Sequence, residues 1–168
     1  MTPRSPSPGT PHGTRAGRTL FWVAAALGIV HATFSAYWAV GGRWLLPTVG
    51  SWAVEFASTA PIASGFVLGI VAIAKLAAAV IPLLNEYGHM PARRFWRAIS
   101  WLGGVGLMIY GGVTAAIGIA VLAGGIATSD GYDKAAMIGH AFLWDPLFFL
   151  WGAALTTALA LTRPRRRQ

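Results

Sequence analysis

The sequence lacks cysteine altogether and contains few charged residues. None of its 168 residues is cysteine, which excludes disulfides, thiolate nucleophiles and metal centres held by cysteine. Charged residues make up 11% of the chain, less than half of the roughly 25% that a soluble domain carries. Hydrophobic residues account for 55%. A water-exposed globular surface cannot be built from this composition, so we expect the chain to lie in a membrane.

Four apolar stretches are each long enough to cross a bilayer. A helix needs about 20 apolar residues to span a hydrocarbon core about 30 Å thick. The stretches are residues 19–40, 60–84, 98–126 and 137–161, and none shows the strict alternation of a membrane β-strand. The first is too long for a cleaved signal peptide. The sequence therefore predicts an all-α membrane protein, a four-transmembrane-helix bundle, with a disordered tail at 1–18 and a basic tail at 162–168.

Most basic residues lie on one side of the predicted spans. Ten are found there: Arg4, Arg15, Arg18, Arg93, Arg94, Arg97, Arg163, Arg165, Arg166 and Arg167. Arg43 and Lys134 lie on the other side, and Lys75 lies within a span. Because cytoplasmic loops are enriched in Lys and Arg, we expect both termini in the cytoplasm and a multi-pass protein of the bacterial cytoplasmic (inner) membrane. The net charge of +8 then reflects topology, so the expected partner is the lipid bilayer and not nucleic acid.

The segment at residues 43–58 is unusually apolar for a loop. Amphipathic aromatic residues such as Trp44 and Trp52 prefer the membrane–water interface. We expect this segment to lie along the outer interface as a partly helical cap over the bundle.

Ionisable residues inside the spans are the candidate functional residues. Inserting such a side chain at the bilayer centre costs about 2.5–3.5 kcal/mol of free energy on insertion scales. Each of these residues is therefore expected to have a structural or functional role that offsets this cost. At 1.5 Å per residue from the cytoplasmic ends, Lys75, His31 and Tyr110 fall near mid-membrane and Asp145 falls about 10 Å above Lys75. These positions predict a polar, outward-opening pocket. Its candidate ligand-binding residues are His31, Lys75, Tyr110, His140, Trp144 and Asp145.

We expect Lys75 to point inward and to be linked to Asp145 or Tyr110, directly or through water, with His31 at the same pocket. His31 and Ser35 share a helix face at i, i+4. The positions of Lys75, His31 and Tyr110 can also be explained without a ligand-binding pocket. Lys75 can snorkel toward the headgroups, and His31 and Tyr110 can be hydrogen-bonded packing residues.

Asp145 with Pro146 has the features of a helix start, with Asp as N-cap and Pro at the first helical position. A helix beginning there has about 24 Å left, too short to span comfortably. The last helix therefore either continues outward through a proline kink or breaks, leaving a half-helix N-terminus within the membrane.

Two motifs are distinctive together: His31-Ala-Thr-Phe-Ser-Ala-Tyr-Trp-Ala-Val-Gly-Gly-Arg-Trp and Gly139-His-Ala-Phe-Leu-Trp-Asp-Pro-Leu-Phe-Phe-Leu-Trp-Gly. The chain resembles, over about residues 19–161, a family of small bacterial four-helix membrane proteins labelled as a domain of unknown function. Its members share a His…Tyr-Trp-Ala-x-Gly-Gly run and a His-x-x-Leu-Trp-Asp-Pro run. The resemblance implies a four-helix integral membrane protein and no particular activity. It also marks positions to test: His31, Tyr37, Trp38, Gly41, Gly42, His140, Trp144, Asp145 and Pro146.

Three functions fit these features. The first is binding or passage of a small ligand or protons through the polar pocket. The second is a non-catalytic, helix-packing subunit that associates with another copy of itself or with another membrane subunit. The glycines at 65, 69 and between 103 and 125 favour this function, because small residues permit close helix packing. The third is a b-type haem protein with His31 and His140 as axial ligands, although His140 lies roughly 13 Å above His31 by helix rise.

No cofactor other than that haem is expected, and an enzyme is a fourth alternative for which no catalytic constellation is recognisable. The sequence contains no nucleophile–base–orienter set, zinc-protease motif or phosphate-binding loop.

Overall fold

The computed structural model describes residues 12–127 and 131–163. Within these ranges the chain forms helices and no β-strand. Four helices are long and apolar enough to cross a membrane: Arg15–Ala39, Pro61–Glu86, Arg93–Leu122 and Lys134–Leu161. The predicted four-helix architecture is therefore confirmed. Residues 1–11 and 164–168, most of the two expected tails, lie outside the described residues.

Helix α1 (His12–Ala39) begins inside the segment that we expected to be disordered. Its first turns lie against the end of helix α6 (Asp145–Leu161), since a Cβ atom added to Gly17 would come within 2.5 Å of Thr162 Cγ2. Short helical segments are stabilised mainly by such tertiary packing. This packing partner, which the local sequence does not reveal, explains the early start of α1.

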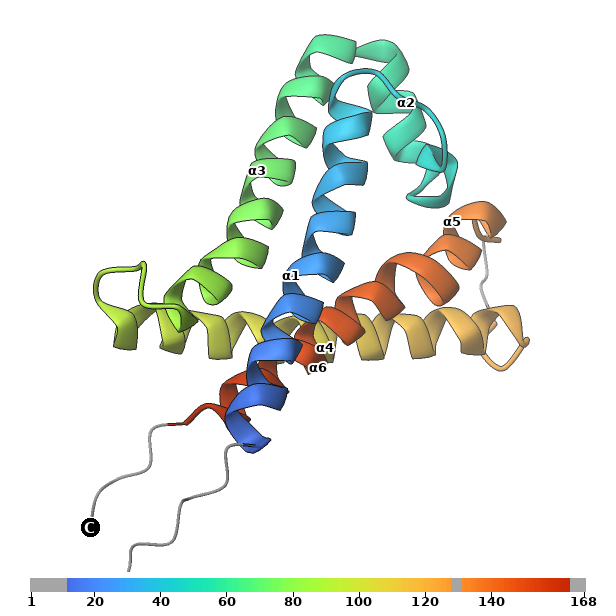
Figure 1. The fold of residues 1–168 in the computed structure, drawn as a ribbon. Coiled ribbons are helices and arrows are strands. Elements are labelled where there is room, and N and C mark those ends of the chain that lie inside the picture. Colours follow the sequence, from blue (N-terminus) through green and yellow to red (C-terminus); the bar gives the residue numbers. More distant parts are fainter. Residues whose placement is uncertain (1–11, 128–130, 164–168) are drawn as a thin grey trace, which may run out of the picture.

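The segment after α1 forms a short 3-10 helix, η1 (Leu46–Thr48), and helix α2 (Ser51–Thr59). Leu46 and Ala53 pack with Trp38 and Trp144 in one buried cluster. Figure 1 shows α2 beside the ends of α1 and α3 (Pro61–Glu86). The expected partly helical cap is thus present.

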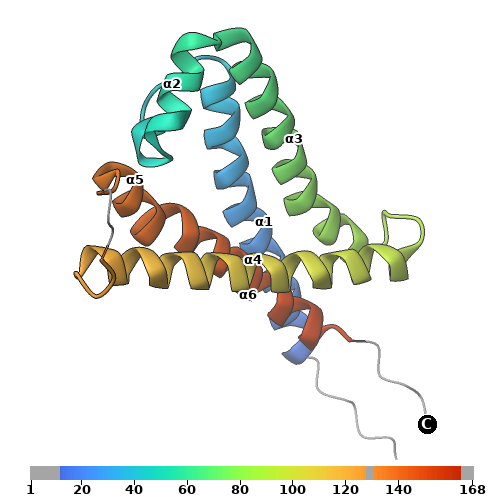
Figure 2. The same ribbon diagram turned by 180° about the vertical axis from the view of Figure 1, so that it is seen from behind.

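The long helices are not mutually parallel. Helix α1 packs along α3 and α6, and α4 (Arg93–Leu122) packs along α6. In contrast, α3 and α4 diverge from the loop that joins them and touch little (Figures 1 and 2). A crevice lined by residues that include Ala78, Gly103 and Leu107 lies between these two helices.

Three glycines spaced seven residues apart bring α4 close to the last helix. Gly104, Gly111 and Gly118 are buried. A Cβ atom on Gly111 would lie 2.6 Å from the backbone nitrogen of Phe149, and one on Gly118 would lie 3.1 Å from Ala141 Cβ. Small residues at helix contacts in membranes permit this close backbone approach.

The last helix is continuous through Asp145. Helix α5 (Lys134–Gly139) leads into a π-helical turn, η2 (His140–Trp144), and then into α6. The Asp145 N–H donates to the His140 carbonyl, five residues back. Because Pro146 has no N–H to donate, this wider turn lets the helix continue. The alternative of a break with an exposed half-helix N-terminus is therefore wrong.

Asp133 joins the starts of α2 and α5. Its carboxylate accepts hydrogen bonds from the Ala136 backbone N–H at 3.1 Å and the Ser51 backbone N–H at 2.8 Å. These donors, the Ala136 N–H first, hold the pKa of Asp133 below its ordinary value because they stabilise the charged form.

Candidate functional site

Lys75 lies in the middle of α3 and points toward α1. Its Nζ donates to Ser35 Oγ at 3.0 Å and lies 3.4 Å from His31 Nδ1. Ser35 and His31 are almost fully buried, with exposed fractions of 1% and 3%. No ion pair in the described part of the chain involves Lys75. We call His31, Ser35 and Lys75 the lysine cluster.

The hydrogen bonds of His31 define its protonation state. Its Nε2 lies 3.1 Å from the Trp144 carbonyl oxygen, so Nε2 must carry the hydrogen. Nδ1 then accepts from Lys75, which makes this imidazole neutral if the ammonium is charged. The ring stacks on Phe148 with centroids 3.9 Å apart, and Lys75 Nζ lies 5.5 Å from the Phe148 centroid. Lys75 therefore meets only neutral partners and an aromatic ring.

A second polar cluster forms around Asp145, which we call the aspartate cluster. Its Oδ1 lies 3.1 Å from His140 Nδ1, and His140 Nε2 lies 3.2 Å from the Val49 carbonyl oxygen. A carbonyl can only accept, so Nε2 donates, and one further proton is shared between Nδ1 and Oδ1. Asp145 is 1% exposed, and its Oδ2 has no hydrogen-bond partner among the described residues. Trp144 Nε1 donates to Thr48 Oγ1 at 3.0 Å beside this cluster.

The structure distributes the predicted site residues over these two clusters. It brings His31 and Lys75 together, as expected, and places Asp145, His140 and Trp144 next to them, linked through the Trp144 carbonyl. The expected direct link from Lys75 to Asp145 or Tyr110 is absent from the hydrogen bonds and ion pairs of the described residues. Tyr110 is 51% exposed and touches Phe148 edge-on, with centroids 5.8 Å apart.

Lys75 lies where two hollows meet. One is a cavity of about 220 Å³ between α1, α2 and α3, which Ser35, Ser64 and Lys75 line together with apolar side chains. The other is an open groove of about 440 Å³ between α3, α4 and α6. Its residues are Ala74, Lys75, Ala78, Gly103, Gly106, Leu107, Tyr110, Phe148 and Trp151. Among the lining residues of both hollows, Lys75 is the one that is formally charged.

A family model described as "Protein of unknown function (DUF3995)" matches residues 13–155. The chain belongs to this family. None of the curated proteins or solved structures compared with it matches significantly.

Sequence reasoning missed one central residue of this DUF3995 protein, Phe148. It stacks on His31 and, at 6.4 Å, lies parallel to Trp151. The available signal is the spacing of Trp144, Phe148 and Trp151, which places three aromatic rings on one helix face. Of these rings, Phe148 contacts both the lysine cluster and Tyr110.

Two observations concern metal or haem binding at these clusters of the DUF3995 protein. The described residues contain no group of three or more potential metal-ligating His, Cys, Asp or Glu residues. Both ring nitrogens of His31 and of His140 have hydrogen-bond partners. An iron would have to displace one of these bonds at each histidine.

Proposed function

We propose that this DUF3995 protein binds, within the membrane, a small molecule that presents a carboxylate to Lys75. One observation carries the proposal. The ammonium lies halfway along a membrane-spanning helix, partly buried, with neutral hydrogen-bond partners and an apolar cavity beside it.

Electrostatics supports a ligand with a negative charge. An unpaired ammonium in hydrocarbon is costly, and a lysine ammonium has three N–H donors. Two of them face Ser35 and His31. A carboxylate that accepts from the third would form a charge-assisted hydrogen bond and neutralise the site.

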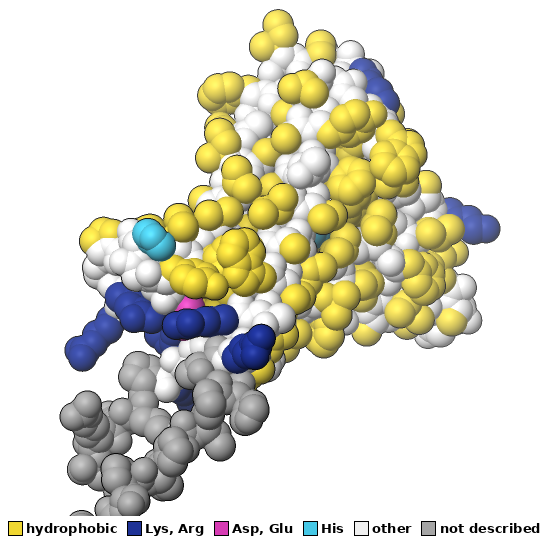
Figure 3. Space-filling model, viewed as in Figure 1, with side chains coloured by type: hydrophobic (Ala, Val, Ile, Leu, Met, Phe, Trp, Pro, Cys, Tyr) yellow, Lys and Arg dark blue, Asp and Glu magenta, His cyan; other side chains and the backbone are white. Residues whose placement is uncertain are grey.

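The charge distribution supports an outward-facing cavity. Arg93 and Arg97 pair with Glu86, Arg97 also bonds Thr162, and Arg163 lies over Trp101. Figure 3 shows Lys and Arg gathered at this end, with isolated basic side chains at the other. Under the positive-inside rule, the arginine-rich end faces the cytoplasm of a bacterial cell, and the cavity under α2 faces outward.

The test uses hexanoate, a small apolar carboxylate, with the full chain in detergent micelles. We expect saturating hexanoate to raise the midpoint of thermal unfolding by several degrees, because binding to the folded state stabilises it. The uncharged analogue hexan-1-ol should have no such effect. Lys75→Met should abolish the hexanoate effect.

Lys134→Met is the matched control, because Lys134 is the only other lysine and is exposed. It should respond to hexanoate like the wild type. Equal responses of wild type and Lys75→Met, or an equal effect of hexan-1-ol, would overturn the proposal.

The second candidate function is a helix-packing subunit of a membrane complex. The observation that favours it is that Cβ atoms added to Gly103 and Gly106 of α4 would meet nothing within 4 Å. A helix of another chain can approach closely at such positions. Chemical cross-linking in native membranes that yields a stable hetero-complex, combined with no hexanoate effect, would favour this function over ligand binding.

A further inference from the structure

We infer that the ligand is a long-chain fatty acid that enters from the bilayer, with its carboxylate on Lys75 and its chain in the crevice between α3 and α4. This inference rests on the proposed function and names the substrate class of the same site.

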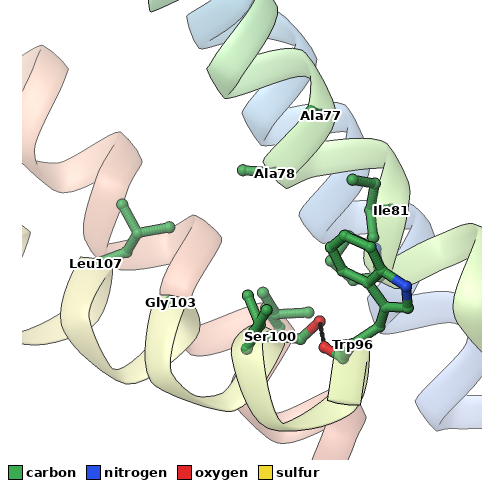
Figure 4. A pocket seen from close by; sticks show the side chains of 10 residues that line it. Ala77, Ala78, Ile81, Trp96, Ser100, Gly103 and Leu107 are labelled. Carbon is green, nitrogen blue, oxygen red and sulfur yellow. Dashed lines mark hydrogen bonds between the residues drawn. The ribbon is translucent and has the colours of Figure 1, made fainter. Parts of the chain in front are cut away.

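The crevice consists of two adjoining hollows that extend from Lys75 toward the arginine-rich end. A smaller hollow of about 110 Å³ lies between α3 and α4 near Trp96 and Ser100. It shares three lining residues with the groove at Lys75: Ala78, Gly103 and Leu107. In Figure 4, Ala77 and Ala78 on α3 lie across a gap from Gly103 and Leu107 on α4. From Trp96 to Tyr110 the crevice follows α4 for about 21 Å, which suits an extended long acyl chain.

The lining of the crevice is suited to hydrocarbon. Alanine, glycine, leucine and isoleucine side chains dominate it. The one serine hydroxyl near Trp96, that of Ser100, already donates to the Trp96 carbonyl at 2.7 Å. Lys75 is therefore the charged group that a chain in this crevice would meet.

The charge of the site selects the headgroup. One negative charge neutralises the single ammonium of Lys75. A carboxylate carries that charge and is small enough for a narrow, otherwise apolar crevice. A phospholipid would have to bury a phosphate, a glycerol backbone and a second chain at mid-membrane, each at a desolvation cost. A quinone carbonyl accepts a hydrogen bond but leaves the ammonium charge uncompensated.

Gly106→Leu is designed to fill the crevice without straining the helix. A Cβ atom at Gly106 meets nothing within 4 Å, and leucine favours helix more than glycine does. Gly69→Leu is the matched control. Gly69 is equally open but lies on α3 in a different hollow, lined by Ile62, Phe66, Ile70 and Ile73 and without Lys75.

The experiment measures binding of radiolabelled palmitate to the full chain in nanodiscs of phosphatidylcholine, with empty nanodiscs subtracted. We expect Gly106→Leu to weaken palmitate binding by at least about tenfold, because the added side chain fills the crevice. Gly69→Leu should bind both palmitate and hexanoate like the wild type. Lys75→Met should lose both.

The outcomes separate this inference from the proposed function. If Gly106→Leu binds palmitate as tightly as the wild type while hexanoate still acts through Lys75, the crevice is not the path of the chain and only the further inference fails. If neither acid depends on Lys75, the proposed function fails as well. If methyl palmitate or a long-chain quinone binds as tightly as palmitate, the assignment of a carboxylate headgroup to Lys75 is wrong. A change of oligomeric mass in Gly106→Leu would instead show that a second copy of the chain fills the crevice.

Discussion

His31, which is buried, and His140, which is partly exposed, make different contacts with their ionisable neighbours. His140 lies between the Asp145 carboxyl group and a backbone carbonyl, and one proton lies between its Nδ1 and Asp145 Oδ1. His31 faces an ammonium and a carbonyl, and it accepts from Lys75 as a neutral ring. The aspartate cluster is therefore internally compensated, whereas the lysine cluster leaves the charge of Lys75 without a counter-ion among the described residues.

A double-mutant cycle on His140→Ala and Asp145→Asn tests the aspartate cluster. His140→Ala strands the buried Asp145 carboxyl group and should lower the free energy of unfolding by about 2 kcal/mol. Asp145→Asn should cost less, because the asparagine amide can still donate to His140 Nδ1. Because the two side chains share one proton, the double mutant should be less destabilised than the sum, by about 1 kcal/mol or more. Unfolding in mixed micelles with increasing denaturing detergent measures all four proteins.

The cycle on Lys75→Met and Asp145→Asn is the comparison for that experiment. These side chains belong to different clusters and make no direct contact. Their coupling should be smaller than that of His140 and Asp145. A larger coupling would show that the ammonium and carboxylate pair in the membrane, contrary to this structure.

The candidate site could be predicted in part from the sequence. The cost of a mid-membrane lysine led to the expectation that Lys75 points inward beside His31, which agrees with the structure, but the bond from Lys75 to Ser35 was not predicted. The partner of Asp145 could not be found in the same way. Counting rise along straight, parallel helices ignores that α4 and α6 cross the other two spans (Figure 1) and that a π-helical turn rotates His140 relative to α6.

At the scale of elements, glycines are distributed unequally around α4. One face, with Gly104, Gly111 and Gly118, contacts the last helix at backbone distance. Another face, with Gly103 and Gly106, borders the crevice. The first face holds the helices together, and the second leaves room beside α3.

Gly111→Ala and Gly103→Ala should therefore have opposite effects. A Cβ atom at Gly111 would overlap the backbone of α6 at Asp145 and Phe149, so α4 must shift and the free energy of unfolding should fall by about 2 kcal/mol or more. At Gly103 a methyl group meets open space, and alanine should stabilise the helix by up to about 1 kcal/mol. Thermal unfolding in one detergent compares both variants with the wild type. Equal losses at the two positions would contradict the assignment of faces.

The contact between α2 and α5 should weaken in acid. The pKa of Asp133 is lowered in the folded state by hydrogen bonds from Ala136 and Ser51, so its contribution is complete above the unfolded pKa of about 4. It is lost as the pH falls through the lower folded pKa. Hydrogen exchange at the Ser51 amide should accelerate over that acidic range beyond its intrinsic pH dependence. Asp133→Asn should remove this excess acceleration; an unchanged pH profile in the variant would refute the role of Asp133.

At the scale of the whole molecule, hydropathy predicts the four spans because each is decided by its own composition. The helix ends and the crevice depend on contacts between segments distant in sequence. The early start of α1 needs the end of α6, and the crevice exists because α3 and α4 each pack on α1 or α6 more than on each other. No window of sequence contains that information.

The absence of cysteine makes the orientation of the molecule directly measurable. Ser58→Cys places a thiol on exposed α2, and His89→Cys places one in the exposed loop between α3 and α4. Since the arginine-rich end should face the cytoplasm, a membrane-impermeant maleimide should label Ser58→Cys in intact spheroplasts and His89→Cys only after lysis. The unmodified chain has no thiol and gives the background. The reverse pattern would place the cavity under α2 on the cytoplasmic side, so that a ligand arriving through it would have to come from within the cell.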